Sequence, residues 1–334
     1  MTSVLTIAEA GSNHNKDLAT ALKLIDAAIA ARADIVKFQT YSSETLYSRH
    51  TPDFAGHTNI PALIKKIQLP REWQQDLKKY CENHGIEFMS TPFDERAVDE
   101  LYELGVKRYK IAGFEASDPR FVQYVAATQL PLIITAGIGV SLELIGNIID
   151  WVKEVNPLPD LTFLHGNNAY PTPYQDINLD QIKLIKERYP EVTVGLSDHT
   201  EGILAPPLAV MAGATVIEKH FTLSRSQIGP DHHFAIEPHE LVKMVDNIRI
   251  AELCRGTKDG VSASEEKELL ARRSVVTRRA IKKGEVLSAD NVTTKRPALV
   301  GSIPALEYYK VLGFTATRDI GDDSVVMWED VCEG

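Results

Sequence analysis

The chain has 334 residues, of which 44% are hydrophobic and 25% are charged. This composition is typical of a globular protein and excludes a chain that is disordered throughout. Lys and Arg number 36 against 46 Asp and Glu, so the formal net charge is −10. An acidic chain is a poor general binder of nucleic acid or of an anionic membrane surface. A small anionic substrate remains possible, because it needs only a few local cations.

The sequence carries no evident targeting or cross-linking pattern. No apolar run approaches the roughly 20 residues of a transmembrane helix, and the first residues are typical of a strand rather than of a signal peptide. Cys81, Cys254 and Cys332 are scattered and odd in number, which argues against a disulfide framework. We therefore expect a soluble, cytoplasmic protein.

Short apolar runs alternate with longer amphipathic runs through the first three quarters of the chain. The runs predicted as strands are 4–10, 34–40, 87–92, 108–115, 130–137, 161–166, 193–199 and 215–221. The clearest helical patterns lie at 18–31, 71–84, 95–104 and 142–155. Eight strand–helix units over roughly 250 residues predict a (β/α)₈ TIM barrel, an α/β fold. An open doubly wound sheet gives a similar alternation, but the glycine-rich phosphate fingerprint of that class is missing.

Two stretches interrupt this alternation. Residues 42–69 form a long connection after the second strand, a length typical of functional lids or interaction arms. Residues 255–273 are polar and charged and are predicted to be a linker with a helical end. The expected organisation is a catalytic barrel over 1–254, this linker, and a small β-rich domain over 274–334.

Polar residues occur at the ends of all eight predicted strands. In a barrel these ends meet at one face, where functional side chains are found. Any one of them could be a satisfied core polar group or a helix cap, but the whole set predicts a site at this face. The candidates are Glu9, Lys37, Gln39, Lys110, Glu115, Thr135, Asn168, Tyr170, Ser197, His199, Glu218 and His220.

His199 and His220 are the most specific pair in this set. They are separated by one strand–helix–strand unit, so they occupy matching positions on neighbouring strands. Two converging imidazoles suit a divalent transition metal with open positions for water or substrate. The alternative is that each histidine hydrogen-bonds a neighbouring strand. Asp231, His232 and His233 could add ligands or could belong to a surface loop.

Lys37 and Lys110 place two ammonium groups at the same face. With the neutral donors of Thr135, Asn168 and Ser197 they predict a phosphate or carboxylate site. The alternative is internal ion pairing, for example with Glu9 or Glu115. The segment 13–15 (Asn-His-Asn) could be no more than a helix N-cap. The residues by themselves therefore predict a metal-assisted reaction of a small anionic substrate.

Ordered motifs along the chain resemble the sialic acid (N-acetylneuraminate) synthase family. They are IAEAGSNHN at 7–15, VKFQT at 36–40, STPF at 90–93, YKI at 109–111, YPTP at 170–173, GLSDHT at 195–200, EKHFT at 218–222 and GPDH at 229–232. The tail resembles that family's antifreeze-like SAF (β-clip) domain through RSVV at 273–276, IKKGE at 281–285 and KRP at 295–297. The resemblance extends over nearly the whole chain.

The resemblance implies a transferase that condenses phosphoenolpyruvate with an N-acetylated hexosamine, such as N-acetylmannosamine, to give a sialic-type acid and phosphate with C–O cleavage. It implies Mn²⁺, or alternatively Mg²⁺ or Co²⁺, on His199 and His220. Phosphoenolpyruvate would be held by Lys37, Lys110, Thr135, Asn168 and Ser197. The sugar would contact Glu9, Gln39, Tyr170, Asp231 and Arg296, and Glu115 would assist proton movement. It also implies a domain-swapped homodimer in which the small domain caps the partner's barrel.

The chain departs from the family pattern at the phosphate site. Gly113 stands where the family usually has a phosphate-binding serine, and Thr135 stands where serine is common. Such changes bear on the acceptor sugar more than on the reaction type. A close alternative is therefore a legionaminic or pseudaminic acid synthase that uses a 2,4-diacetamido-trideoxyhexose. More remote alternatives are a Schiff-base aldolase and a sugar-binding protein without catalysis.

Overall fold

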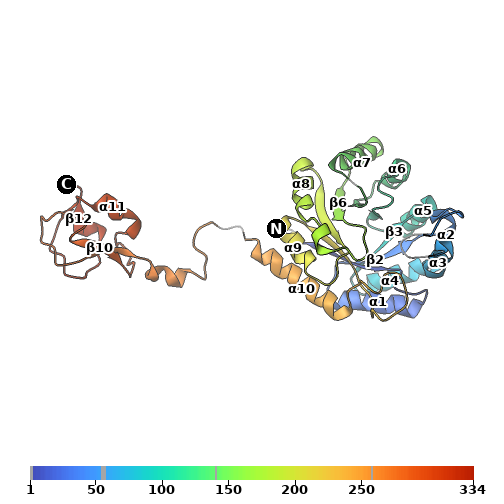
Figure 1. Cartoon of the computed structure of the whole chain (residues 1–334), viewed down its shortest axis with the longest axis horizontal. Coiled ribbons are helices and arrows are strands. Elements are labelled where there is room, and N and C mark those ends of the chain that lie inside the picture. The colour runs from blue at the N-terminus through green and yellow to red at the C-terminus, as the bar shows by residue number, and fades with distance from the viewer. Residues whose placement is uncertain (1–2, 54–57, 140, 257–258) are drawn as a thin grey trace. The chain divides into compact units, whose positions relative to one another are not determined.

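Eight parallel strands, each followed by helix, form the first of two units in this computed structural model (Figure 1). The structure describes residues 3–53, 58–139, 141–256 and 259–334. The chain divides into compact units Met1–Gly256 and Thr257–Gly334, which are treated separately below. Residues 54–57 of the predicted long connection and 257–258 of the predicted linker lie outside the described residues.

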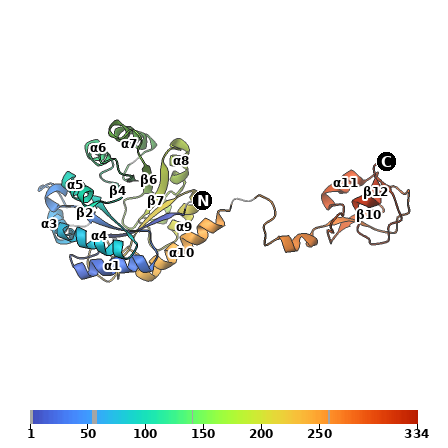
Figure 2. The same ribbon diagram turned by 180° about the vertical axis from the view of Figure 1, so that it is seen from behind.

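The strands run in the order β3-β2-β1-β8-β7-β6-β5-β4, and β3 packs beside β4 to close the barrel. Helices surround this central sheet, as both ribbon views show (Figures 1 and 2). This confirms the TIM barrel. The bounds are β1 Leu5–Gly11, β2 Ile35–Thr40, β3 Glu87–Pro92, β4 Tyr109–Ile111, β5 Leu132–Ala136, β6 Leu161–Gly166, β7 Thr193–Asp198 and β8 Val216–His220.

The barrel interior has an apolar floor beneath a polar layer. The floor is made by Ile7, Ile35, Met89, Ile133, Leu164 and Val216. Because side chains two residues apart on a strand point to the same face, the next inward residues on five of these strands are polar: Glu9, Lys37, Thr91, Thr135 and Glu218. The sequence pattern therefore places these polar groups directly above the apolar layer of the barrel interior.

The helices of the barrel bury their other faces against the outside of the sheet in one large apolar cluster. They are α1 Leu18–Ala30, α2 Ser43–Leu46, α3 Ile60–Ile67, α4 Gln74–Asn83, α5 Glu95–Leu104, α6 Pro119–Ala126, α7 Leu142–Val155, α8 Asp180–Arg188, α9 Ala205–Ala212 and α10 Pro238–Cys254. None of the helices in the described part of the chain is long and apolar enough to cross a bilayer.

Two local expectations were wrong, and the predicted long connection contains regular structure. The strand predicted over 108–115 ends at Ile111, because the chain then turns through hydrogen bonds from Glu115 and Ala116 to the Ala112 carbonyl. The long connection 42–69 contains helices α2 and α3. The N-cap of α1 is Asp17, whose side chain accepts the Thr20 N–H, and not the segment 13–15.

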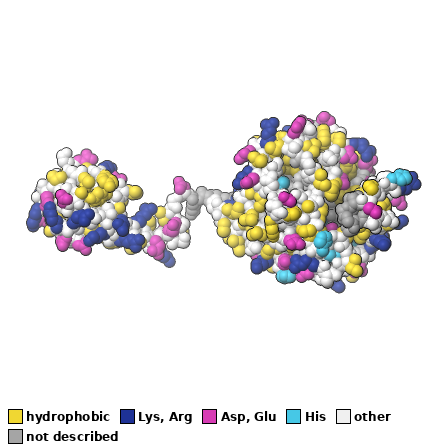
Figure 3. All heavy atoms as spheres, in the orientation of Figure 1, with side chains coloured by type: hydrophobic (Ala, Val, Ile, Leu, Met, Phe, Trp, Pro, Cys, Tyr) yellow, Lys and Arg dark blue, Asp and Glu magenta, His cyan; other side chains and the backbone are white. Residues whose placement is uncertain are grey.

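The C-terminal unit has its own small apolar core and little regular structure. Its strands are β9 Ser274–Thr277, β10 Val292–Lys295, β11 Thr315–Ala316 and β12 Val331–Cys332, paired as β10-β9 and β11-β12. Val275, Ile281, Val292, Ile303 and Val326 lie at the centre of its core. A short 3₁₀ helix, Glu266–Ala271, precedes β9. Figure 3 shows Lys and Arg side chains gathered along one side of this unit.

Candidate active site

The polar strand ends surround one cavity at the C-terminal face of the barrel. Most of the predicted site residues line it, together with Thr91, Phe93, Ala112, Gly113 and Phe114. The predicted residues among the lining are Glu9, Lys37, Gln39, Lys110, Thr135, Asn168, Tyr170, Ser197, His199, Glu218 and His220. Asp231 and Glu115 lie beside it, and Arg296 is an exposed residue of the C-terminal unit.

Two lysines and two carboxylates form a buried charge cluster at the centre of the cavity. Lys37 Nζ lies 2.9 Å from Glu9 Oε2 and 3.6 Å from Glu218 Oε1, and Lys110 Nζ lies 3.4 Å from Glu218 Oε1. All four side chains are at most 4% exposed. The internal ion pairing considered for the lysines is therefore present, with Glu218 rather than Glu115 as the carboxylate of Lys110.

Burial and ion pairing act in opposite directions on these groups. Burial disfavours charged Lys37, but the charges of Glu218 and Glu9 outweigh it and raise the Lys37 pKa. For Lys110 burial prevails and lowers the pKa, although Glu218 opposes the shift. Glu218 is buried too, yet Lys110 and Lys37 hold its pKa below the usual range. Without substrate, the carboxylates supply the negative charge that an anionic substrate would otherwise bring.

His199 is held as a neutral imidazole with one free nitrogen. Its Nδ1 lies 2.5 Å from the Asn167 carbonyl oxygen, so Nδ1 carries the hydrogen and Nε2 keeps its lone pair. Burial, followed by repulsion from His220, lowers the His199 pKa to about 3. The imidazole is thus available as a ligand at neutral pH, and a hydrogen bond from the other ring nitrogen is the usual support for a metal-bound histidine.

The donor set fits a divalent ion that has open coordination positions. The His199 and His220 rings are 5.4 Å apart between centroids. His220 Nδ1 is buried, has no hydrogen-bond partner in the described part of the chain, and lies 3.5 Å from Asp231 Oδ2. Within the described ranges no three or more His, Cys, Asp or Glu side chains form a metal cluster. His232, whose Nδ1 bonds Thr222 Oγ1 at 2.6 Å, adds no third imidazole to the pair. The residues suit an ion completed by water or substrate oxygen.

Neutral groups complete the lysine side of the cavity. Thr135 Oγ1 is buried and has no hydrogen-bond partner among the described residues. Asn168 Oδ1 accepts the Ile138 N–H at 3.1 Å, which leaves its amide N–H₂ turned toward the Tyr170 hydroxyl at 3.4 Å. The Tyr170 ring lies over His199 with 4.3 Å between centroids. A bound anion would accept a hydrogen bond from the buried Thr135 hydroxyl in the cavity that the two lysines also line.

Gly113 and Gly137 are required by close packing against Asn168. A Cβ at Gly137 would lie 2.2 Å from Asn168 Oδ1, and a Cβ at Gly113 would lie 3.0 Å from the same oxygen and from Gly137 Cα. The glycine found where the resemblance implies serine is thus part of a tight contact in this chain. Asn168 occupies the space that a side chain at 113 would enter.

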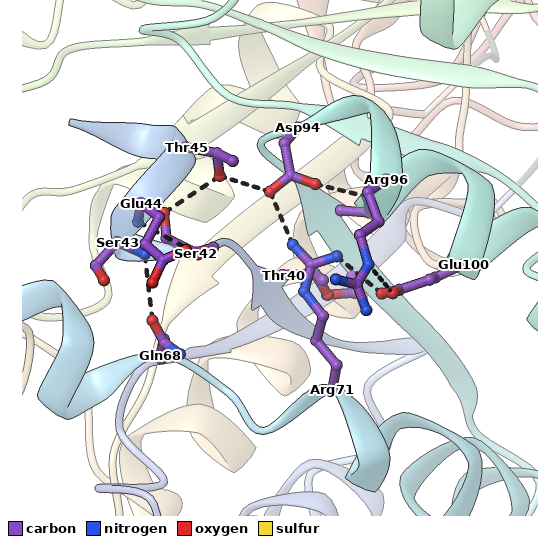
Figure 4. A network of polar contacts seen from close by, with 12 residues as sticks. Thr40, Ser42, Ser43, Glu44, Thr45, Gln68, Arg71, Asp94, Arg96 and Glu100 are labelled. Atoms are coloured by element: carbon purple, nitrogen blue, oxygen red, sulfur yellow. Dashed lines mark hydrogen bonds and ion pairs between the residues drawn. The ribbon is translucent and has the colours of Figure 1, made fainter. Parts of the chain in front are cut away.

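Glu115 lines a separate, larger cavity of about 900 Å³ that shares Phe93 and Phe114 with the first. Burial raises the Glu115 pKa to about 7, and its Oε2 has no hydrogen-bond partner among the described residues. One wall of this cavity is fixed by the network in Figure 4. There Asp94 Oδ2 accepts bonds from Thr45 Oγ1 and Arg71 Nη2, both at 2.7 Å.

Sequence reasoning noted Glu218 and Thr91 as polar strand-end residues but gave neither a role. Glu218 precedes His220 by two residues and so shares its face, which was a usable signal. Thr91 receives a hydrogen bond of 3.0 Å from Lys37 Nζ. Its only signal was its position at the end of a strand.

The comparisons with known proteins identify the family to which the chain belongs. The model of the NeuB family matches residues 24–260, and that of the SAF domain matches 272–331. The N,N'-diacetyllegionaminic acid synthase of Legionella pneumophila is 38% identical, with 97% of this chain and 94% of the relative covered. The pseudaminic acid synthase of Campylobacter jejuni (strain 81-176) is 39% identical, with 95% and 93% covered.

A solved structure shares the fold as well as the sequence. The crystal structure of N-acetylneuraminic acid (sialic acid) synthetase from Leptospira borgpetersenii, in complex with citrate, is 34% identical to this chain. The match has a TM-score of 0.71 and covers 80% of this chain and 90% of that one. The fold of this chain is therefore shared with this synthetase.

Proposed function

We propose that this chain, which belongs to the NeuB family and carries a SAF domain, is a nonulosonic acid synthase. It condenses phosphoenolpyruvate with an N-acetylated hexosamine to give a sialic-type acid and phosphate. The observation that carries this proposal is one cavity with two lysines on one side and two histidines on the other. Because phosphoenolpyruvate is an intracellular metabolite, we place the reaction in the cytoplasm.

The reaction forms one carbon–carbon bond and one carbon–oxygen bond, the latter from water to C2, and it breaks the bond between C2 and the bridging oxygen of the phosphate group. C3 of phosphoenolpyruvate attacks the sugar aldehyde carbon, and the aldehyde oxygen becomes a hydroxyl after taking up a proton. Water adds to C2, and the C2–O bond to phosphorus then breaks, so that phosphate leaves with the bridging oxygen. No external oxidant or reductant is needed.

Phosphoenolpyruvate is assigned to the lysine side of the cavity. Lys37 and Lys110 would bind its phosphate and carboxylate oxygens and exchange part of their present ion pairing for these contacts. Thr135 Oγ1, Ser197 Oγ and the Asn168 amide would add neutral donors. The buried, unpartnered Thr135 hydroxyl supports this assignment.

A divalent ion, Mn²⁺ by preference, is assigned to His199 and His220. When bound it would supply a Lewis acid that polarises the sugar aldehyde and orders a water molecule. The protein keeps His199 neutral and aims its Nε2 by the bond from Nδ1 to Asn167. Asp231 Oδ2 lies 3.5 Å from Nδ1 of the second ring, His220.

The acceptor sugar is assigned to Glu9, Gln39, Tyr170 and Asp231. Gln39 Nε2 donates to Glu9 Oε1 at 2.7 Å, so these two side chains present one hydrogen-bonded surface to hydroxyl groups. Glu115, with a raised pKa, can donate a proton near neutral pH. N-Acetylmannosamine is the first candidate acceptor. A 2,4-diacetamido-trideoxyhexose is the second candidate. It is favoured because the relatives at 38% and 39% identity are a legionaminic and a pseudaminic acid synthase.

We further propose a domain-swapped homodimer, in which the SAF domain covers the partner's barrel. The barrel mouth binds an anion, and the C-terminal unit carries Lys and Arg along one side (Figure 3). Arg296, exposed on that unit, would reach the sugar in the partner's site. Analytical ultracentrifugation tests the dimer, and an Arg296→Ala variant with a raised acceptor KM tests the cap.

The proposed function is tested by phosphate release from phosphoenolpyruvate with added Mn²⁺ over a panel of N-acetylated hexosamines. We expect acceptor-dependent release that is abolished by a chelator and by His199→Ala. Release with N-acetylmannosamine identifies a sialic acid synthase, and release only with a diacetamido sugar identifies the second candidate. If folded protein that binds Mn²⁺ releases no phosphate with any acceptor, the result contradicts the proposal.

A further inference from the structure

An ion pair between Asp198 and Lys219 lies directly behind the two histidines. The two residues are register partners on β7 and β8, and Lys219 Nζ lies 2.8 Å from Asp198 Oδ2. Their side chains are 0% and 1% exposed. Because successive side chains on a strand alternate in direction, this pair lies on the outer face of the sheet, whereas His199 and His220 face the cavity.

The same pair also binds the backbone on the far side of His199. Asp198 Oδ1 accepts the Thr200 N–H at 2.9 Å, and Lys219 Nζ donates to the Thr200 carbonyl oxygen. Asp198 and Thr200, the residues on either side of His199, are thus both hydrogen-bonded to Lys219, the residue before His220. The His199 carbonyl is fixed separately by the Thr172 N–H at 2.9 Å.

We infer that the Asp198–Lys219 pair is a positioning device that sets the separation and orientation of His199 and His220, and thereby the affinity for the divalent ion. This inference rests on the proposed function, which places the ion on these two imidazoles. Neither Asp198 nor Lys219 lines the cavity, so they act through the histidines.

A purely structural role makes a different prediction. Neutral side chains of similar volume commonly replace a buried ion pair with little loss of stability, because both desolvation penalties disappear together. If stability were the only role, such a double replacement would leave the histidines and their ion unaffected. If the pair positions the histidines, the folded double variant binds the ion more weakly.

The test uses the full-length protein with Asp198→Asn and Lys219→Met combined. The amide oxygen of the introduced asparagine can still accept the Thr200 N–H, so the variant removes the charges and the lysine bonds while it keeps side-chain volume. Isothermal titration calorimetry with MnCl₂ and without substrate measures the ion affinity, and the electron paramagnetic resonance spectrum of Mn²⁺ reports its environment. Circular dichroism confirms the fold.

We expect the Kd for Mn²⁺ to rise about 10- to 100-fold, as when a supporting hydrogen-bond partner of a metal ligand is lost. Phosphoenolpyruvate affinity without metal should fall less than Mn²⁺ affinity, since Lys37 and Lys110 lie on β2 and β4. The matched control combines Arg108→Met with Glu87→Gln, which removes a cross-strand ion pair of 2.8 Å at the opposite ends of the strands. Its Mn²⁺ affinity should equal that of the wild type.

An unchanged Kd for Mn²⁺ in the folded double variant overturns the inference and leaves the proposed function intact. If the double variant does not fold, Asp198→Asn alone is measured, and an unchanged Kd there has the same meaning. Wild-type protein that binds no Mn²⁺, or binds it equally after His199→Ala, overturns the metal site and this inference together.

Discussion

Lys37 and Lys110 approach the same oxygen atom, Glu218 Oε1, from two different strands, at Nζ–Oε1 distances of 3.6 and 3.4 Å. One buried carboxylate therefore holds both ammonium groups at the place where the anionic substrate is assigned. The arrangement explains how two lysines remain in a buried cavity before substrate binds. Because Lys37 lies on β2 and Lys110 lies on β4, the contribution of each lysine can be measured by mutating it alone.

Lys110→Met should weaken phosphoenolpyruvate binding about 10- to 100-fold. The variant removes one charge-assisted hydrogen bond, worth about 1.5–3 kcal/mol, and keeps the side-chain volume. Isothermal titration calorimetry without acceptor measures the effect. Lys107→Met, at an exposed lysine three residues earlier, is the control and should bind as wild type. Equal affinity of the Lys110 variant would remove this lysine from the anion site.

Gly137→Ala should damage the site more than Gly113→Ala. The added methyl at 137 meets Asn168 Oδ1 at 2.2 Å and must displace it, whereas at 113 the nearest atoms are at 3.0 Å. Overpacking of this kind costs about 1–3 kcal/mol of stability. We expect the 137 variant to lose stability and phosphoenolpyruvate affinity together. Urea unfolding and calorimetry check this order, and the reverse order would refute the packing argument.

Glu115 should make the protein less stable as pH rises from about 4.5 to 7. Its folded pKa, raised by burial to about 7, exceeds the ordinary value of 4.5. The folded state therefore binds more protons in this window, and the free energy of unfolding falls by up to about 3 kcal/mol. His199, whose pKa is lowered to about 3, acts oppositely, because stability is lost as pH falls from 6.5.

A comparison of variants separates the contributions of Glu115 and His199 to the pH dependence of the free energy of unfolding. Glu115→Gln removes only the first, so its unfolding free energy relative to wild type should increase between pH 5 and 7. Urea unfolding at several pH values measures the difference. Glu72→Gln, at an exposed carboxyl of the same cavity, should run parallel to wild type. A Glu115 variant that also runs parallel would show that the carboxyl is not held protonated.

Asp94→Ala should destabilise the wall of the larger cavity. Asp94 caps α5 by accepting the Ala97 N–H at 2.7 Å and also pairs with Arg71 (Figure 4). Loss of the cap alone costs about 0.5–2 kcal/mol, and loss of the Asp94–Arg71 ion pair adds to this, although Arg71 keeps its pair with Glu100. Asp94→Asn keeps a cap acceptor and should recover most of the stability in thermal unfolding. Equal losses in both variants would assign the effect to the ion pair alone.

The barrel and most of its polar mouth could be predicted because both depend on periodicities within single strands. On β2, for example, Ile35 belongs to the apolar floor of the barrel, and Lys37, two residues later, lines the cavity above it. The end of β4 could not be predicted, since the turn that removes Glu115 from the strand is set by hydrogen bonds to Ala112. The role of Gly113 was equally hidden, because it depends on the distant Asn168.

The most direct test of the condensation follows the bridging oxygen of phosphoenolpyruvate. The substrate is labelled with ¹⁸O between C2 and phosphorus and incubated with Mn²⁺ and the accepted sugar, and the released phosphate is examined by ³¹P nuclear magnetic resonance. The account predicts phosphate that retains the ¹⁸O, formed only when the sugar is present. Phosphate without the label would mean that the P–O bond is hydrolysed, and phosphate formed equally without sugar would mean that its release is not coupled to condensation. Either result would contradict the account.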